Sequence, residues 1–187
     1  MLKRKHELGV SLTELMVVVV ILGVVMGIAI PSYRTWVVNT QISVKAQAIL
    51  NGLQLARAEA LKRNTGIVFA MVGGSSWSVG CEAAVADRDG DGLADCPAVI
   101  HSKAAEEGGQ AVSVTVTPDG NTHLTYNGIG MVRSANADGS GPIAQIDLDS
   151  GSVEAGASRE LRILVTSGGM ARLCDPGVAA NGDPRRC

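Results

Sequence analysis

A single carboxylate, Glu14, stands at the edge of an uncharged apolar run that covers residues 15–33. A carboxylate deep in a bilayer costs about 2.5 to 3.5 kcal/mol, and acids found there usually have a partner and a function. The alternative is an acid near the lipid headgroups, whose side chain reaches water.

A second group of carboxylates lies in the sequence DRDGDGLAD, which follows part of a calcium-loop pattern. The twelfth position is Ala98 instead of a bidentate glutamate, so calcium would need water or another loop to complete its shell. The alternative is a turn that uses Asp and Gly for their backbone preferences. We expect no cofactor, with calcium as the open alternative. The oxygen ligands would come from Asp87, Asp89, Asp91, Leu93 and Asp95.

The four cysteines divide into two sequence-local pairs, Cys81 with Cys96 and Cys174 with Cys187. Four cysteines allow three connectivities, and the short intervals favour local pairing. Disulfides persist in oxidising compartments, whereas a metal site would need clustered CxxC spacing, which is absent. We therefore expect two disulfides, with buried free thiols as the alternative.

The element that carries Glu14 is expected to be a membrane helix. At a rise of 1.5 Å per residue, about 20 apolar residues cross a hydrocarbon layer of about 30 Å. Lys3, Arg4 and Lys5 precede the run, so the positive-inside rule leaves the first residues in the cytoplasm. A cleaved secretory signal is the alternative, but the run continues through Pro31 without a small-residue cleavage site. Pro31 is expected to kink the helix.

Beyond Pro31 a helical period continues over residues 36–62, and the sequence NTG at residues 64–66 provides a stop. The polar side chains, among them Lys45 and Arg57, are expected mostly on the solvent side. The apolar stripe predicts packing against a core. Its members are Val38, Ile42, Ala46, Ile49, Leu53, Ala56 and Ala60.

After residue 66 the pattern changes to short segments rich in β-branched residues, which predict strands. The segments are GIVFAMV, AVSVTVT, THLTY, IAQIDL and LRILVT, separated by turn clusters such as GGSS and PDGN. Such short connections favour antiparallel pairing. The predicted fold class is α+β, with a long N-terminal helix packed on an antiparallel β-sheet domain. His101 and His123 lack an HExxH partner or a nucleophile motif, so we expect no enzyme.

The sequence GVSLTELMVVVVILG resembles the leader of type IV prepilins. The resemblance implies that prepilin peptidase cuts after Gly9 and methylates the new amino terminus at Val10, where phenylalanine is usual. It further implies that the ammonium of Val10 pairs with Glu14 of a neighbouring subunit during assembly. Pro31 would then let the helix adapt.

The sequence LNGLQLARAEALKRN resembles the helix-to-sheet junction of the GspH/FimT/FimU group of minor pilins and pseudopilins. The implied organisation is a leader at 1–9, a transmembrane half-helix at 10–33, an amphipathic half-helix at 34–64 and a periplasmic β-rich domain at 65–187. The implied function is that of a non-enzymatic subunit, anchored by a single pass in the bacterial inner membrane. Its partners would be prepilin peptidase and other pilins or pseudopilins, in either a type IV pilus or a type II secretion pseudopilus.

The C-terminal sequences SGGMARLC and GDPRRC resemble the tail of FimT-type minor pilins that bind DNA for natural transformation. The implied phosphate contacts are Arg172, Arg185 and Arg186, while Met170 replaces the first arginine of the Gly-Arg-x-Arg pattern. Three cations on a chain of net charge -2 make a small electrostatic footprint. DNA binding is therefore the alternative function, and filament assembly is preferred.

Overall fold

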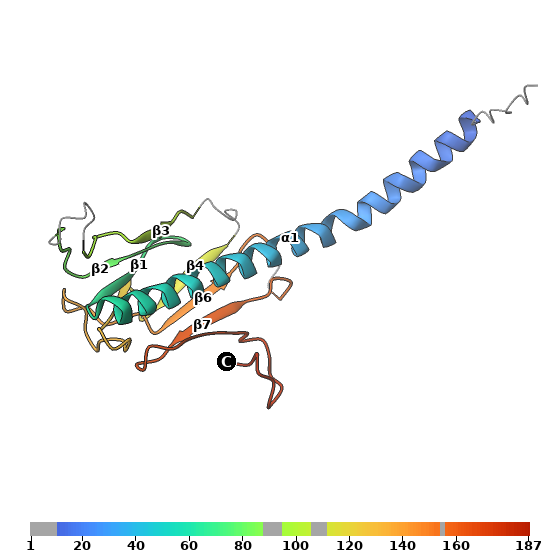
Figure 1. Ribbon diagram of the computed structural model, residues 1–187. Coiled ribbons are helices and arrows are strands. Elements are labelled where there is room, and N and C mark those ends of the chain that lie inside the picture. The colour runs from blue at the N-terminus through green and yellow to red at the C-terminus, as the bar shows by residue number, and fades with distance from the viewer. Residues whose placement is uncertain (1–10, 88–94, 106–111, 154–155) are drawn as a thin grey trace, which may run out of the picture. The chain divides into compact units, whose positions relative to one another are not determined.

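The computed structural model describes residues 11–87, 95–105, 112–153 and 156–187 (Figure 1). The chain divides into two compact units, residues 1–37 and 38–187. In the described residues one long helix, α1 (Leu12–Arg63), precedes all the strands. The strands are β1 (Ile67–Gly73), β2 (Ser76–Cys81), β3 (His101–Lys103), β4 (Ser113–Thr117), β5 (His123–Tyr126), β6 (Gln145–Asp149), β7 (Leu161–Val165) and β8 (Ala171–Cys174).

The part of α1 in the first unit presents apolar side chains on every side. The large apolar residues between Leu12 and Tyr33 whose side chains the structure describes keep 49% to 77% of their surface exposed. By length and composition, no single described helix qualifies as a membrane span, whereas Leu12–Gly27 and Ser32–Arg63, which meet at a bend, qualify as a pair. The break between these two segments contains Pro31, which removes a backbone hydrogen bond from a helix.

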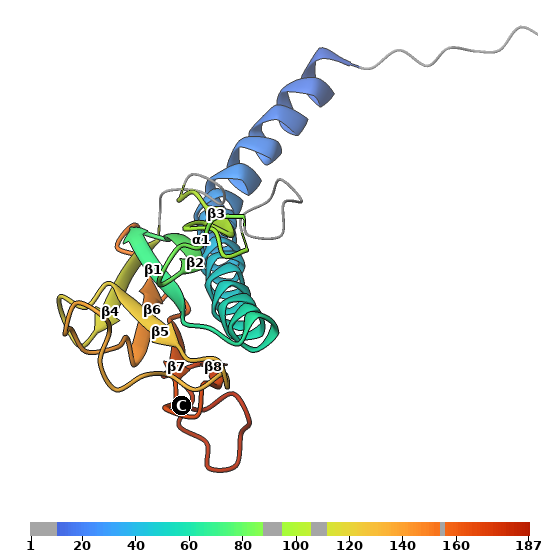
Figure 2. The ribbon, with the colours of Figure 1, turned by 60° about the vertical axis from the view of Figure 1, so that its left-hand side comes forward.

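The part of α1 in the second unit buries the predicted apolar stripe. Every member of the stripe is at most 8% exposed, and both sheets lie on the same side of this part of the helix (Figures 1 and 2). Lys45, which was expected on the solvent side, is instead 4% exposed. Burial lowers the pKa of the Lys45 ammonium, because the charged form loses its hydration.

Two four-stranded sheets complete the second unit. The first has the order β3-β2-β1-β5 and the second the order β4-β6-β7-β8. All strand pairs are antiparallel. Buried residues alternate along β1, β6 and β7, as with Ile67, Phe69 and Met71 of β1, so these strands turn one face to the core. The α+β fold class predicted from the sequence is confirmed.

Three strands were missed by the sequence prediction, namely β2, β3 and β8. Strand β2 has the sequence SWSVGC, in which serines and a glycine dilute the β-branched signal, yet it buries Trp77 and Val79. Strands β3 and β8 have only 3 and 4 residues, too few for a period to show. Their position depends on pairing with β2 and β7, not on local pattern.

Helix α1 and the first sheet approach closely at Gly52. A Cβ atom built at this position would lie 2.9 Å from Cε2 of Phe69 and 3.0 Å from Cδ2 of Trp77. These two rings pack on each other with centroids 5.9 Å apart. Because real Cβ contacts are rarely this short, a larger residue at position 52 would push the helix away from the aromatic pair.

The apolar stripe predicts that Leu53→Ala lowers the free energy of unfolding of the full-length chain by about 2 to 5 kcal/mol, because Leu53 is fully buried. Urea titration of the detergent-solubilised chain, followed by circular dichroism, measures this change. The matched control is Leu61→Ala, since Leu61 is 51% exposed and its truncation should cost under about 1 kcal/mol. Equal losses for the two variants would contradict the assignment of the stripe.

Candidate functional site

The first turn of α1 carries the predicted assembly residue Glu14. The amide of Leu15 donates to the carbonyl of Ser11 at 3.1 Å, which makes Ser11 the residue that caps the helix. The hydroxyls of Ser11 and Thr13 lie 2.8 Å apart. Glu14 follows in the first turn, where the free amides and the helix dipole stabilise a carboxylate by about 0.3 to 1 kcal/mol. Gly9 and Val10 lie outside the described residues.

The Glu14 carboxylate is open to a partner from outside the chain. Its side chain is exposed, and no hydrogen bond or ion pair joins it to another described residue. The apolar side chains that follow it are exposed as well. A carboxylate at the edge of such a surface is suited to an ion pair that forms when two apolar helices come together.

Both disulfides close short intervals at the ends of strands. Cys81, the last residue of β2, pairs with Cys96 at a Cα–Cα distance of 5.7 Å. Cys174, the last residue of β8, pairs with Cys187 at 5.1 Å. Of the three connectivities that four cysteines allow, the structure contains the local one.

The three arginines of the C-terminal tail already contact groups of the same tail. Arg185 pairs with Asp183 at 2.7 Å, and this side-chain hydrogen bond is the main reason why the pKa of Asp183 falls to about 2. The guanidinium of Arg186 donates to the side-chain oxygen of Asn181, and that of Arg172 to the Cys187 carbonyl at 3.4 Å. Because Asp183 neutralises Arg185, the tail presents less positive charge to phosphates than the sequence suggested. DNA binding is not favoured.

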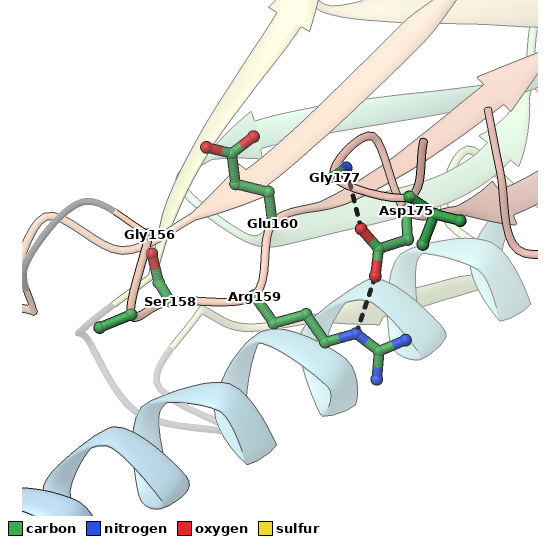
Figure 3. Close-up of a pocket in the computed structure, with 8 residues that line it drawn as sticks. Gly156, Ser158, Arg159, Glu160, Asp175 and Gly177 are labelled. Carbon is green, nitrogen blue, oxygen red and sulfur yellow. Dashed lines mark hydrogen bonds and ion pairs between the residues drawn. The ribbon is translucent and has the colours of Figure 1, made fainter. Parts of the chain in front are cut away.

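A polar pocket lies between the segment that precedes β7 and the tail that follows β8 (Figure 3). Two of its charged groups pair, since Nε of Arg159 lies 3.0 Å from Oδ2 of Asp175, whose other oxygen accepts from the Gly177 amide at 3.0 Å. The Arg159 amide also donates to Oδ1 of Asn39 on α1 at 2.8 Å. These contacts hold the tail, β7 and the helix together.

The histidines do not assemble a nucleophilic site within the described part of the chain. Nε2 of His123 lies 3.6 Å from Oδ1 of Asp138, but the Ser140 hydroxyl donates to the same carboxylate oxygen at 2.7 Å. In a catalytic triad the base contacts the hydroxyl and the acid contacts the base. Here Asp138, the acid, lies between His123 and Ser140. The hydrogen bond from Ser140 is the main cause of the lowered pKa of Asp138. His101 packs on Trp77 with ring centroids 5.6 Å apart.

The calcium loop falls mostly outside the described residues. The structure describes Asp87 and Asp95, whereas Asp89, Asp91 and Leu93 lie in the undescribed range 88–94. In the residues that it does describe, no group of three or more His, Cys, Asp or Glu side chains could hold a metal ion. Calcium at this loop therefore stays a prediction.

Two residues with structural consequences gave no signal in the sequence. The side chain of Asn136, in a segment that resembles a simple turn, is buried and accepts from Oγ1 of Thr125 at 3.0 Å. Its amide nitrogen donates to the carbonyls of His123 and Gly141, which holds this loop against β5. Tyr126 is fully buried, and its hydroxyl has no hydrogen-bond partner among the described residues.

Comparison with known proteins identifies two family models and one fold. The model of type II transport protein GspH matches residues 45–169, and the prokaryotic N-terminal methylation motif matches residues 4–30. The crystal structure of the type IV minor pilin FimU of Pseudomonas aeruginosa is similar at 15% identity with a TM-score of 0.50, covering 76% of this chain and 94% of that one. A second crystal form of FimU gives 15% identity, a TM-score of 0.48 and coverage of 74% and 97%. At this identity the likeness to FimU concerns the fold.

The environment of Tyr126 predicts a late alkaline ionisation. Burial raises the pKa of Tyr126 to about 12 because the phenolate would lose its hydration, and the nearby Arg57 charge only partly opposes this. The raised pKa favours the neutral phenol in the folded state. The stability that the fold gains from the neutral Tyr126 phenol is thus fully present below pH about 10 and is lost as the pH rises toward about 12.

Ultraviolet titration of the phenolate measures this shift in the full-length chain. We expect one ionisation near pH 12 that Tyr126→Phe abolishes, while Tyr33→Phe, the matched control, leaves it in place. An ionisation removed by Tyr126→Phe that occurs near pH 10 in the folded chain would show that the hydroxyl is solvated.

Proposed function

Because this chain belongs to the family of type II transport protein GspH, whose model matches residues 45–169, we propose that it is assembled as a minor pilin or pseudopilin. In this role it is a structural subunit of a type IV pilus or of a type II secretion pseudopilus. The observation that carries the proposal is a helix with exposed apolar side chains on all sides, which starts at one unpaired carboxylate and continues into the folded unit.

The proposed processing creates the partner of Glu14. The methylation motif matches residues 4–30, which supports cleavage after Gly9 and methylation of Val10. Cleavage leaves an ammonium at Val10, about one helical turn before Glu14. In a bundle of such helices, the ammonium of one subunit neutralises the Glu14 carboxylate of its neighbour. The ion pair then removes the cost of an isolated charge at the membrane boundary.

The same proposal assigns a compartment to each part of the chain. Residues 10–33 would cross the bacterial inner membrane once, residues 34–64 would form the amphipathic half of the helix, and residues 65–187 would lie in the periplasm. The basic residues before the apolar run support this orientation. Both disulfides are compatible with an oxidising compartment. Pro31 would allow the two helix halves to adjust during assembly.

Removal of the Glu14 carboxylate tests the docking role. We expect Glu14→Ala to be processed normally, but to fall about tenfold or more in the sheared filament fraction, because a lost ion pair worth about 1.4 kcal/mol changes an equilibrium tenfold. Quantitative immunoblotting of membrane and filament fractions measures both steps. Asp119→Ala removes an exposed carboxylate from the turn after β4 in the second unit and serves as the control. Normal incorporation of processed Glu14→Ala would exclude the docking role.

Mass spectrometry of the membrane-extracted chain tests the processing step. The wild-type chain should begin at a methylated Val10, whereas Gly9→Val should retain residues 1–9, because the peptidase is expected to require the small residue at the cut. Gly27→Ala, a change away from the proposed cleavage point, should be processed as the wild type is. Finding an intact leader on the wild-type chain, or loss of the helix past Tyr33, would overturn the proposed processing.

A further inference from the structure

Three segments that are distant in the sequence meet at one place on the second unit. A Cβ built at Gly130, in the connection between β5 and β6, would lie 3.2 Å from Cγ of Leu61 and from Nε of Arg57 on α1. A Cβ built at Gly169, in the turn between β7 and β8, would lie 1.9 Å from the Gly130 carbonyl oxygen. Both glycines have positive φ angles, 75° and 82°, so the close approach and the backbone conformation both require glycine.

The segments that meet here carry large, exposed apolar side chains, since Leu61 contacts the Gly130 position, Ile129 and Met131 flank Gly130, and Met170 follows Gly169. Leu61 is 51% exposed, Ile129 67%, Met131 43% and Met170 63%. We call these four residues the apolar rim. Single exposed apolar residues are ordinary on protein surfaces, whereas groups of them are a feature of interaction surfaces. The two methionines can adapt their shape to a partner, because their side chains are unbranched.

Beside this meeting point lies a pocket of about 280 Å³, and its lining includes Arg57, Tyr126 and Met170 of the apolar rim. The Nε atom of Arg57 donates to the Gly130 carbonyl at 3.1 Å, which fixes the guanidinium, while its terminal amino groups have no hydrogen bond to any described residue. The helix neighbours three and four residues away are uncharged. They are Leu53, Gln54, Ala60 and Leu61. The pocket therefore holds a positioned, half-buried cation without a counter-charge from the described chain.

A second polar group lies at the wall of the same pocket. Tyr126 is fully buried there, and its hydroxyl has no hydrogen-bond partner among the residues that the structure describes. A buried hydroxyl without a partner is unfavourable and is rare in folded proteins. The terminal amino groups of Arg57 and the hydroxyl of Tyr126 are thus hydrogen-bond donors without an acceptor among the described residues, and they lie beside exposed apolar side chains.

We propose that the apolar rim and Arg57 bind a segment of a neighbouring filament subunit that presents a carboxylate among apolar side chains. A carboxylate matches the two free amino groups of the guanidinium, which form a planar fork. A nucleic-acid phosphate would also pair with Arg57, but it would bring a strongly hydrated backbone against four apolar side chains. The acidic, apolar peptide therefore fits the surface better. The identity of the partner as a filament subunit rests on the function proposed above.

The chemistry of the surface is tested on the full-length chain in detergent micelles with ¹³C-labelled methionine methyl groups. The probes are the capped dipeptides acetyl-Leu-Glu-amide and acetyl-Leu-Gln-amide, which differ only in the carboxylate. We expect the acidic probe to shift the Met131 and Met170 resonances and to bind about tenfold or more tightly than the neutral one. Arg57→Gln should remove the difference, whereas Arg172→Gln should keep it. Equal binding of the two probes, or none, would overturn the proposal.

Folding of each variant is checked by its melting temperature and by the absence of free thiols. If Arg57→Gln does not fold, Met170→Glu replaces it, because Met170 is exposed and an added carboxylate there would repel the acidic probe. Loss of binding by Met170→Glu then supports the site, and unchanged binding contradicts it. A short DNA duplex that displaces the acidic dipeptide from the wild-type chain and binds more tightly would also contradict the proposed partner.

Incorporation into filaments tests the source of the carboxylate. Arg57→Gln should be processed and membrane-anchored as the wild type is, but should fall about tenfold or more in the filament fraction, with Arg172→Gln unchanged. Normal incorporation of folded Arg57→Gln would overturn the neighbouring subunit as the partner. Absence of the wild-type chain from filaments would instead overturn the proposed function and the partner with it, while the dipeptide titration still decides whether the surface binds a carboxylate.

Discussion

The structure depends on one constraint, namely that a single helix must suit two different surroundings. Over its first part α1 is apolar on all sides and exposed. Over its second part the apolar residues narrow to one stripe, which both sheets cover. This stripe and the aliphatic residues of the strands build the core of the second unit, because the chain has few aromatic residues to fill it. The sheets, the disulfides and the tail are arranged around that helix.

Much of this fold can be predicted from local pattern. The stripe on α1 follows a period that any turn of helix repeats, and the segments of β1, β4, β5, β6 and β7 carry enough β-branched residues to be recognised. Lys45 shows the limit of this approach, since its position beside Ala46 on the helix and the packing around it bury a residue whose type predicts exposure. Strand β2 escaped prediction because its serines and glycine dilute the β-branched signal, and β3 and β8 escaped it because they are short and depend on pairing with β2 and β7.

The two candidate sites, Glu14 and the surface around Arg57, also differ in whether the local sequence reveals them. Glu14 could be singled out because one carboxylate beside a long apolar run is unusual, and that signal is contained in the adjoining sequence. The surface around Arg57 could not, because α1, the connection after β5 and the turn after β7 contribute to it jointly. Sequence reasoning assigned Arg57 to the solvent face of an amphipathic helix. Only the tertiary structure shows that a glycine carbonyl fixes the guanidinium and that a buried tyrosine hydroxyl lies beside it.

The exposed apolar turns of α1 also affect the thermodynamics of association. A helix of this kind, held in a bilayer, confines the folded unit to the plane of the membrane, so that two subunits meet by lateral diffusion. Part of the translational entropy that free proteins lose on binding is thus lost before they meet. Confinement also raises the local concentration of subunits. Contacts between the folded units can therefore be individually weak and readily reversed, which favours a polymer whose subunits are added and removed at the membrane.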